Sequence, residues 1–145
     1  YFANSSAARA NGIEAEAEAK WPNGLQARVS YTYAHTEDTQ DVPLSNSPRH
    51  VTQALLSVPL PANIAASFDM QVLSSRLTRD GNVVDGYLLP NLTITAPFAG
   101  RRGHVSFDIR NLTNERHSDP AGDDYLQQAV QQNGRTARVF VTFGF

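Results

Sequence analysis

Cysteine is absent from the 145-residue sequence, and lysine is almost absent. Without cysteine the chain can form no disulfide and no thiolate metal site. Lys20 is the single lysine beside eleven arginines, and the net charge of −2 with a pI near 6.1 shows no basic excess. A protein that binds nucleic acid normally carries such an excess, so we expect no nucleic-acid partner.

A long apolar run is also missing. No stretch of about 18 consecutive apolar residues occurs, which excludes a transmembrane helix. The mean hydropathy of −0.37 resembles that of a water-soluble protein, but a membrane β-barrel needs apolar residues on only one face of each strand. The sequence begins at Tyr1 with no charged-then-apolar leader, so we expect a mature form or a fragment.

Signatures of catalysis and metal binding are lacking too. The sequence holds no phosphate-binding loop, nucleophile elbow or kinase-type motif, and its histidines are scattered, at His35, His50, His104 and His117. His35 and His50 flank the same polar segment and could approach each other, so a haem or metal site there is a less favoured alternative. We expect no enzyme, no catalytic residue and no cofactor, although a transported ligand could itself be an iron complex.

What the sequence does contain is alternation with a period of two residues. In NGIEAEAEAKW, residues 11–21, apolar and charged side chains take opposite faces. Alanine and glutamate favour helices, but a period of two is that of a strand. Asn23-Gly24 is a strong hairpin signal, and a second alternating segment follows it at residues 25–36. Together they predict a long β-hairpin.

The charged face of this hairpin is the clearest candidate polar site. Closely spaced carboxylates can serve acid–base chemistry or bind a cation, but a charged inner wall is also the norm in a wide barrel. We favour the second interpretation, a lumenal charged row made of Glu14, Glu16, Glu18 and Arg28.

Five further segments alternate in the same way, at residues 49–58, 64–77, 84–96, 104–112 and 135–145. The connections after residues 21, 58 and 96 are short, whereas those after residues 36, 77 and 112 are longer and more polar. Short turns on one rim and long loops on the other are typical of outer-membrane barrels, and strands of about 9–11 residues suit a bilayer crossing. The prediction is an all-β fold, an antiparallel up-and-down transmembrane β-barrel meander of about seven or eight strands.

Aromatic residues gather near the ends of these segments. Girdles at the two membrane interfaces require that placement, so we assign an interfacial role to Trp21, Tyr31, Tyr33 and Tyr87. The final segment, RTARVFVTFGF, alternates up to its last residue. It predicts a strand with Val139, Val141, Phe143 and Phe145 facing lipid and Phe140 as an apolar exception on the inner face.

Five stretches in this order resemble the C-terminal part of TonB-dependent outer-membrane receptors: NGIEAEAEAKWPNGLQARVSYTYAHT, LSNSPRHV, SSRLTRDGNVVDGYLLPNLTI, FDIRNLTNERHSDPAGDD and GRTARVFVTFGF. The resemblance implies a 22-stranded barrel in the bacterial outer membrane that takes up a scarce small-molecule ligand such as a ferric siderophore, haem or cobalamin. It also implies energy from the TonB complex, reached through an N-terminal region with a plug domain and a TonB box. Neither is present here, so residues 1–145 are expected to form a single barrel segment. The strand 139–145 then resembles the signal read by the barrel-assembly machinery.

Two alternatives remain at this point. If residues 1–10 added an eighth strand, the chain could be a stand-alone small barrel, the smallest bacterial type. A soluble β-sandwich or ligand-carrying barrel is less favoured, because the acidic row of the first hairpin does not suit a face that must be buried. The identity of the ligand does not follow from these residues.

Overall fold

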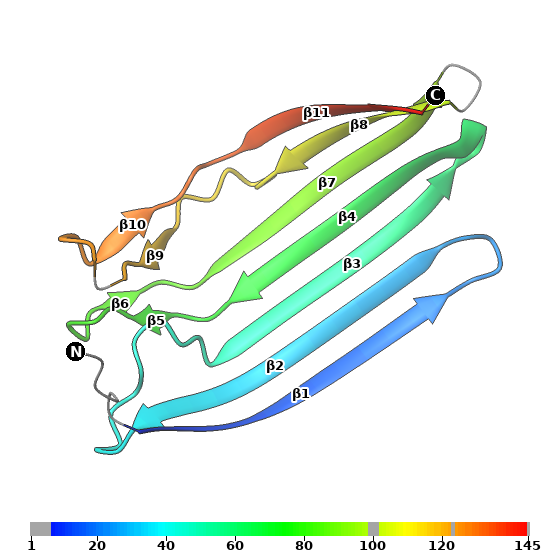
Figure 1. The fold of residues 1–145 in the computed structure, drawn as a ribbon. Coiled ribbons are helices and arrows are strands. Elements are labelled where there is room, and N and C mark those ends of the chain that lie inside the picture. The colour runs from blue at the N-terminus through cyan, green and yellow to red at the C-terminus, as the bar shows by residue number, and fades with distance from the viewer. Residues whose placement is uncertain (1–6, 99–101, 123, 145) are drawn as a thin grey trace.

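The chain forms one antiparallel β-sheet. The computed structural model describes residues 7–98, 102–122 and 124–144. Its main sheet has seven strands in the order β1-β2-β3-β4-β7-β8-β11, which lie side by side in a single layer (Figure 1). The strands are β1 (Ala8–Lys20), β2 (Gln26–Asp38), β3 (His50–Leu60), β4 (Ile64–Leu73), β7 (Tyr87–Phe98), β8 (Gly103–Arg110) and β11 (Thr136–Phe143).

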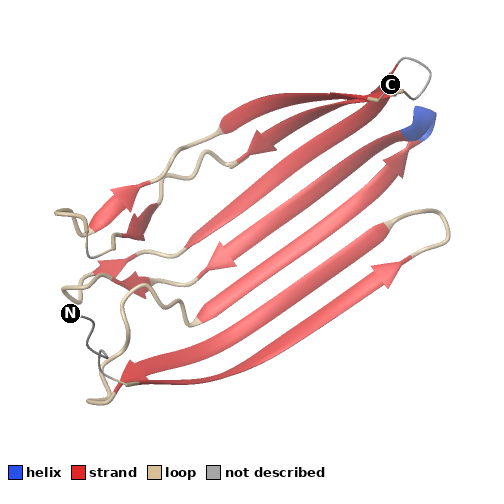
Figure 2. Ribbon diagram, viewed as in Figure 1, coloured by secondary structure: helices blue, strands red, loops and turns tan. Residues whose placement is uncertain are grey.

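The connections confirm the predicted alternation of short turns and long loops. β1 and β2 are joined by a tight turn in which Gly24 has φ +86°, a conformation that glycine adopts without strain. A 3-10 turn, η1 (Pro61–Asn63), joins β3 and β4 at the same end of the sheet. The long connections lie at the other end, and Figure 2 shows that strands and loops make up nearly the whole chain.

Two long connections contain small hairpins that the sequence did not reveal. β5 (Arg76–Leu77) pairs with β6 (Val83–Val84), and β9 (Ser118–Pro120) pairs with β10 (Ala129–Gln131). The fourth predicted segment, 64–77, is therefore interrupted after Leu73, and the polar stretch 113–134 is not wholly loop. β1 also begins at Ala8 rather than at residue 11, because Ala8 to Gly12 pair with the end of β2 despite their irregular alternation.

Pro90 lies inside β7, although proline is normally excluded from central strands. Its carbonyl accepts a hydrogen bond from the backbone N–H of Leu112, and the N and C=O of one strand residue point to the same side. That side faces β8, which ends at Arg110. The missing N–H of Pro90 therefore removes no ladder bond to β4, and the strand tolerates it.

The sheet has one apolar and one polar face. Directly paired residues of antiparallel strands share a face, and neighbours along a strand alternate. Following the pairing from strand to strand places on one face Ile13, Ala17, Val29, Ala54, Leu56, Phe68, Leu92, Ile94, Phe107, Val139 and Val141. The opposite face carries mostly polar residues, among them Glu16, Arg28, Gln53, Asp69, Thr93 and Asp108.

The described residues contain no buried hydrophobic side chain. The buried polar or charged residues are Arg76, Thr78, Asn91, Asp108 and Asn111, and the other buried residues are Pro90, Gly103 and Pro120. A β-sandwich buries the inner faces of two packed sheets, whereas this main sheet has no second layer (Figure 1). The β-sandwich alternative is therefore wrong for the described residues. Within the described residues no helix has the length and apolarity to span a membrane.

Both edges of the main sheet are open. In the part of the chain that the structure describes, β1 pairs only with β2, and β11 pairs only with β8. The two edge strands lie at opposite margins (Figure 1), so the sheet does not close on itself. An unpaired edge exposes a row of backbone N–H and C=O groups, so each edge of this antiparallel meander can pair with a further strand.

Candidate functional site

The polar face is held together by a network across β4, β7 and β8. The Asp108 carboxylate accepts hydrogen bonds from the Thr93 hydroxyl (2.8 Å) and the Arg110 Nε (2.9 Å). Arg110 also lies 3.6 Å from the Asp69 carboxylate, which accepts a 2.6 Å bond from the Asn91 amide. Asp108 is only 3% exposed. A buried carboxylate requires such partners, so this network fixes the spacing of three strands.

The charges on β1 and β2 form weaker, exposed pairs. Arg28 donates to Glu16 at 2.9 Å, and Lys20 lies 2.9 Å from Glu18. Glu14 pairs in register with Thr32 and so shares the face of these residues. The predicted row Glu14, Glu16, Glu18 and Arg28 thus occupies one face. Among the described residues no three His, Asp or Glu side chains are grouped to hold a metal ion.

A hollow of about 490 Å³ joins these two parts of the polar face. Its lining mixes carboxylates, guanidinium groups and amides, including Glu16, Arg28, Gln53, Asp69, Asn91 and Arg110. Because the hollow offers cationic donors, anionic acceptors and neutral amides, its surface can hydrogen-bond a polar partner or water. We find there no nucleophile paired with a base, so the arrangement favours binding over catalysis.

Aromatic side chains lie toward both ends of the apolar face. Near the long loops, the Tyr31 hydroxyl lies 2.8 Å from His50 Nδ1, and the Tyr33 ring centroid lies 5.3 Å from that of His50. At the short-turn end, the rings of Phe98 and Phe143 lie 6.1 Å apart. Trp21 directly follows β1 at this same end. These placements agree with two aromatic girdles.

Tyr87 differs from the other predicted girdle residues. It begins β7, as expected of a residue at a strand end, but it pairs with Leu73 and so belongs to the polar face. Its ring lies 4.3 Å from that of His117, and the Arg76 guanidinium lies 5.4 Å from its centroid. Tyr87 therefore contacts residues of the long connections and does not belong to the apolar face.

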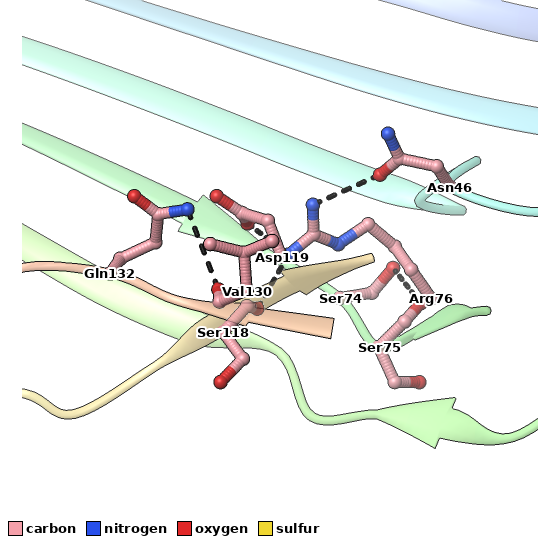
Figure 3. A network of polar contacts seen from close by, with 8 residues as sticks. All are labelled: Asn46, Ser74, Ser75, Arg76, Ser118, Asp119, Val130 and Gln132. Carbon is pink, nitrogen blue, oxygen red and sulfur yellow. Dashed lines mark hydrogen bonds and ion pairs between the residues drawn. The ribbon is translucent and has the colours of Figure 1, made fainter. Parts of the chain in front are cut away.

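Arg76 joins three long connections into one cluster, which we call the loop clamp (Arg76, Asn46, Ser118 and Asp119; Figure 3). Its Nη1 donates to the Asn46 side chain at 3.2 Å. Its Nη2 donates to the Ser118 carbonyl at 3.3 Å and to the Asp119 carboxylate at 2.7 Å. Arg76 is only 6% exposed. A guanidinium so placed holds the loops in a defined arrangement.

Asparagines in left-handed conformation shape the ends of the loops. Asn46, Asn111 and Asn114 have φ values of 53°, 56° and 56°, a region that asparagine tolerates better than most residues. The Asn111 side chain accepts from the Glu115 N–H and donates to the Glu115 carbonyl, both at 2.8 Å. The Asn114 side chain accepts from the Arg135 N–H at 2.9 Å. Asn46, Asn111 and Asn114 lie within the stretches LSNSPRHV and FDIRNLTNERHSDPAGDD, whereas no spacing or motif in the sequence assigns a role to Arg76.

The last strand places its alternating residues as expected. Val139 and Val141 pair with Phe107 and Val105 on the apolar face, and Phe143 pairs with Gly103. A Cβ at Gly103 would collide with the Phe98 ring, so glycine permits this aromatic contact. Phe140 lies opposite Ser106 on the polar face. Phe145, the fourth residue of the predicted assembly signal, lies outside the described residues.

The histidines have separate partners. His35 Nε2 lies 3.1 Å from the Glu37 carboxylate, His50 bonds Tyr31, and His117 contacts Tyr87. His104 pairs with Thr142 in the register of β8 and β11. No contact joins His35 to His50 among the described residues, so the alternative haem or metal site gains no support.

Comparison with known proteins gives one family. The family model described as TonB dependent receptor-like, beta-barrel, matches residues 1–112. No curated protein matches the chain.

Proposed function

The chain belongs to the TonB-dependent receptor-like β-barrel family, and we propose that it forms barrel wall and extracellular loops of a bacterial outer-membrane receptor. Members of this family are outer-membrane transporters and not enzymes. For this chain we propose uptake of a scarce small-molecule ligand, such as a ferric siderophore, by a 22-stranded barrel of which residues 1–145 are one segment.

The observation that carries this proposal is the two-faced single sheet. All the large apolar side chains of the apolar face are accessible, and no described hydrophobic residue is buried. Soluble monomers rarely expose a contiguous apolar patch of more than a few hundred Å². Lipid tails on the apolar face and water on the polar face satisfy both surfaces of such a wall, so outer-membrane lipid is the proposed partner.

Two further partners follow from this placement. The long connections form the side that would meet the ligand, because extracellular loops are the long ones in such barrels. The TonB complex would act through a region outside this chain. Closure of the barrel would need strands that pair with the open edges of β1 and β11.

Fractionation of cells that produce the full-length protein tests the membrane assignment. We expect the protein in the outer-membrane fraction, with a gel mobility that changes on heating as the folded barrel unfolds. Recovery in the periplasmic fraction with unchanged mobility would refute the assignment. Uptake of a panel of radiolabelled ferric siderophores, with and without TonB, tests the ligand class separately. An outer-membrane protein that imports none of them would overturn only the proposed uptake of a ferric siderophore.

We also propose that Val139, Val141, Phe143 and Phe145 form the signal read by the barrel-assembly machinery. The first three share the apolar face of an open edge strand, which leaves their backbone free to pair with another strand. Deleting Phe145 from the full-length protein should sharply lower its outer-membrane level. Phe140→Ala, a change on the polar face of the same strand, is the control and should leave the level near normal.

A further inference from the structure

A second hollow, of about 270 Å³, lies among the long connections. It is bounded by the end of β2, the β2–β3 loop and the segment from Ser74 to Val83 that follows β4. Its polar lining residues are chiefly Arg49, Arg76, His50, Thr36, Ser47 and Ser74. No carboxylate contributes to the lining. The hollow therefore presents donors and positive charge.

Arg49 supplies the unbalanced charge of this hollow. Within the described residues its guanidinium has no ion-pair partner and no hydrogen-bond acceptor, although its backbone carbonyl accepts from Ala34. The charge of Arg76 is balanced by Asp119 at 2.7 Å, and His50 is engaged by Tyr31. The hollow thus carries about one net positive charge, which suits a monoanion.

Arg76 retains donor capacity on the wall of the hollow. Three hydrogen bonds from its terminal nitrogens are directed to Asn46, Ser118 and Asp119, whereas a guanidinium has five N–H groups. The Nε–H is buried and has no acceptor among the described residues. Buried polar groups are almost always hydrogen-bonded, so the Nε–H is an unusual unsatisfied donor next to the hollow.

The remaining lining is apolar. It comes from both loops, with Pro43 and Leu44 on one side and Leu77 and Val83 on the other. Ligand pockets typically combine an apolar lining with a few polar groups that fix orientation. The hollow, at about 270 Å³, is slightly smaller than the usual size range of such pockets, about 300–1,000 Å³, and so suits a compact ligand.

We propose that this hollow binds a small organic monoanion, a carboxylate on a compact apolar body. The carboxylate pairs with Arg49, hydroxyls of the lining donate to it, and the apolar body packs on Leu44 and Leu77. The inference rests on the proposed receptor function and adds a ligand class to it, since the hollow lies on the side of the long loops. A bidentate arginine–carboxylate pair supplies both orientation and affinity.

Binding of benzoate to the purified full-length protein in detergent micelles tests this site. We expect saturable binding by calorimetry, about ten-fold weaker in Arg49→Gln, because a hydrogen bond to a charged group is lost. Arg49→Lys should retain part of the affinity because it keeps the charge. The matched control is Arg135→Gln, an exposed arginine outside this lining. Benzylamine, which reverses the ligand charge, should not bind.

Two results would overturn the site: no saturable benzoate binding to the wild-type protein, or equal binding by Arg49→Gln and the wild type. A heat-modifiable gel shift confirms that each variant is folded before titration. Because fractionation measures membrane placement independently, an outer-membrane protein that fails to bind benzoate rejects this site alone. A protein recovered outside the membrane rejects the proposed function.

Discussion

Leu55 and Leu56 are neighbours on β3 with nearly equal exposure, 42% and 41%, yet they lie on opposite faces of the sheet. Leu55 pairs with Arg28 and Asp69, whereas Leu56 pairs with Ala27 and Phe68. Equal exposure therefore does not mean an equal environment. For a single-layer wall, the residues around a side chain indicate its solvent better than its accessible area does.

The two faces also differ in what they contribute to the fold. The polar face carries ion pairs and hydrogen bonds that link strands, such as the contacts of Asp108 with Thr93 and Arg110. On the apolar face no aliphatic or aromatic side chain is buried among the described residues. We infer that the polar face is internally satisfied, whereas the apolar face depends on lipid.

The largest effect should come from placing a charge on the apolar face. Leu56→Arg in the full-length protein should destabilise the folded barrel by about 2–4 kcal/mol, the range for arginine facing the middle of a bilayer. Urea unfolding in lipid vesicles measures this change, and heat-modifiable mobility reports the folded fraction. Leu55→Arg is the matched control, with an expected change below about 1 kcal/mol, since lumen-facing substitutions avoid lipid. Equal effects of the two variants would contradict the assignment of the faces.

Alternation predicted the strands of the main sheet because the pleat directly imposes its period on the sequence. Residues 25–36 and 104–112 correspond closely to β2 and β8. The same alternation places Tyr87 on the polar face and its neighbour Leu88 on the apolar face. Its assignment to the girdle rested on its position at a strand end alone, which does not identify a face.

The loop clamp could not be predicted because its contacts join distant segments. Arg76 lies 30 residues from Asn46 and 43 from Asp119 along the chain, and no local period relates these positions. The hairpins β5–β6 and β9–β10 are only two and three residues per strand, too short for alternation to appear. Such contacts depend on how the sheet brings the loops together.

Removing the clamp should loosen the loops without unfolding the sheet. Arg76→Ala leaves the Asn46, Ser118 and Asp119 acceptors without their donor, at a local cost of about 1–3 kcal/mol. Limited proteolysis of the full-length protein in outer membranes should then cut the loops 39–49 and 113–134 faster. Arg135→Ala is the control and should leave the cleavage rates unchanged. If the loops of Arg76→Ala were cleaved no faster than those of the control and the wild type, Arg76 would not join the three loops.

A smaller effect should follow from changing the buried carboxylate of the polar face. Asp108→Asn keeps an acceptor for Thr93 but weakens the pair with Arg110. We expect a loss of about 1 kcal/mol, at the low end for a charged hydrogen bond, because lumenal water can solvate the freed groups. The midpoint of urea unfolding measures it. A loss of stability as large as that of Leu56→Arg would mean that water does not reach the polar face around Asp108.

The smallest effect should come from the exposed end of the polar face. Glu16 and Arg28 form a 2.9 Å pair with side chains 50% and 55% exposed, and ion pairs so exposed contribute little because water and salt screen them. Glu16→Gln should leave the unfolding midpoint and the outer-membrane level unchanged. Comparison of Glu16→Gln with Asp108→Asn distinguishes two kinds of charge on the polar face: charges that link strands and charges that are simply solvated. A clear loss of stability in Glu16→Gln would show that β1 packs against a partner on its polar side, since only desolvation strengthens such a pair.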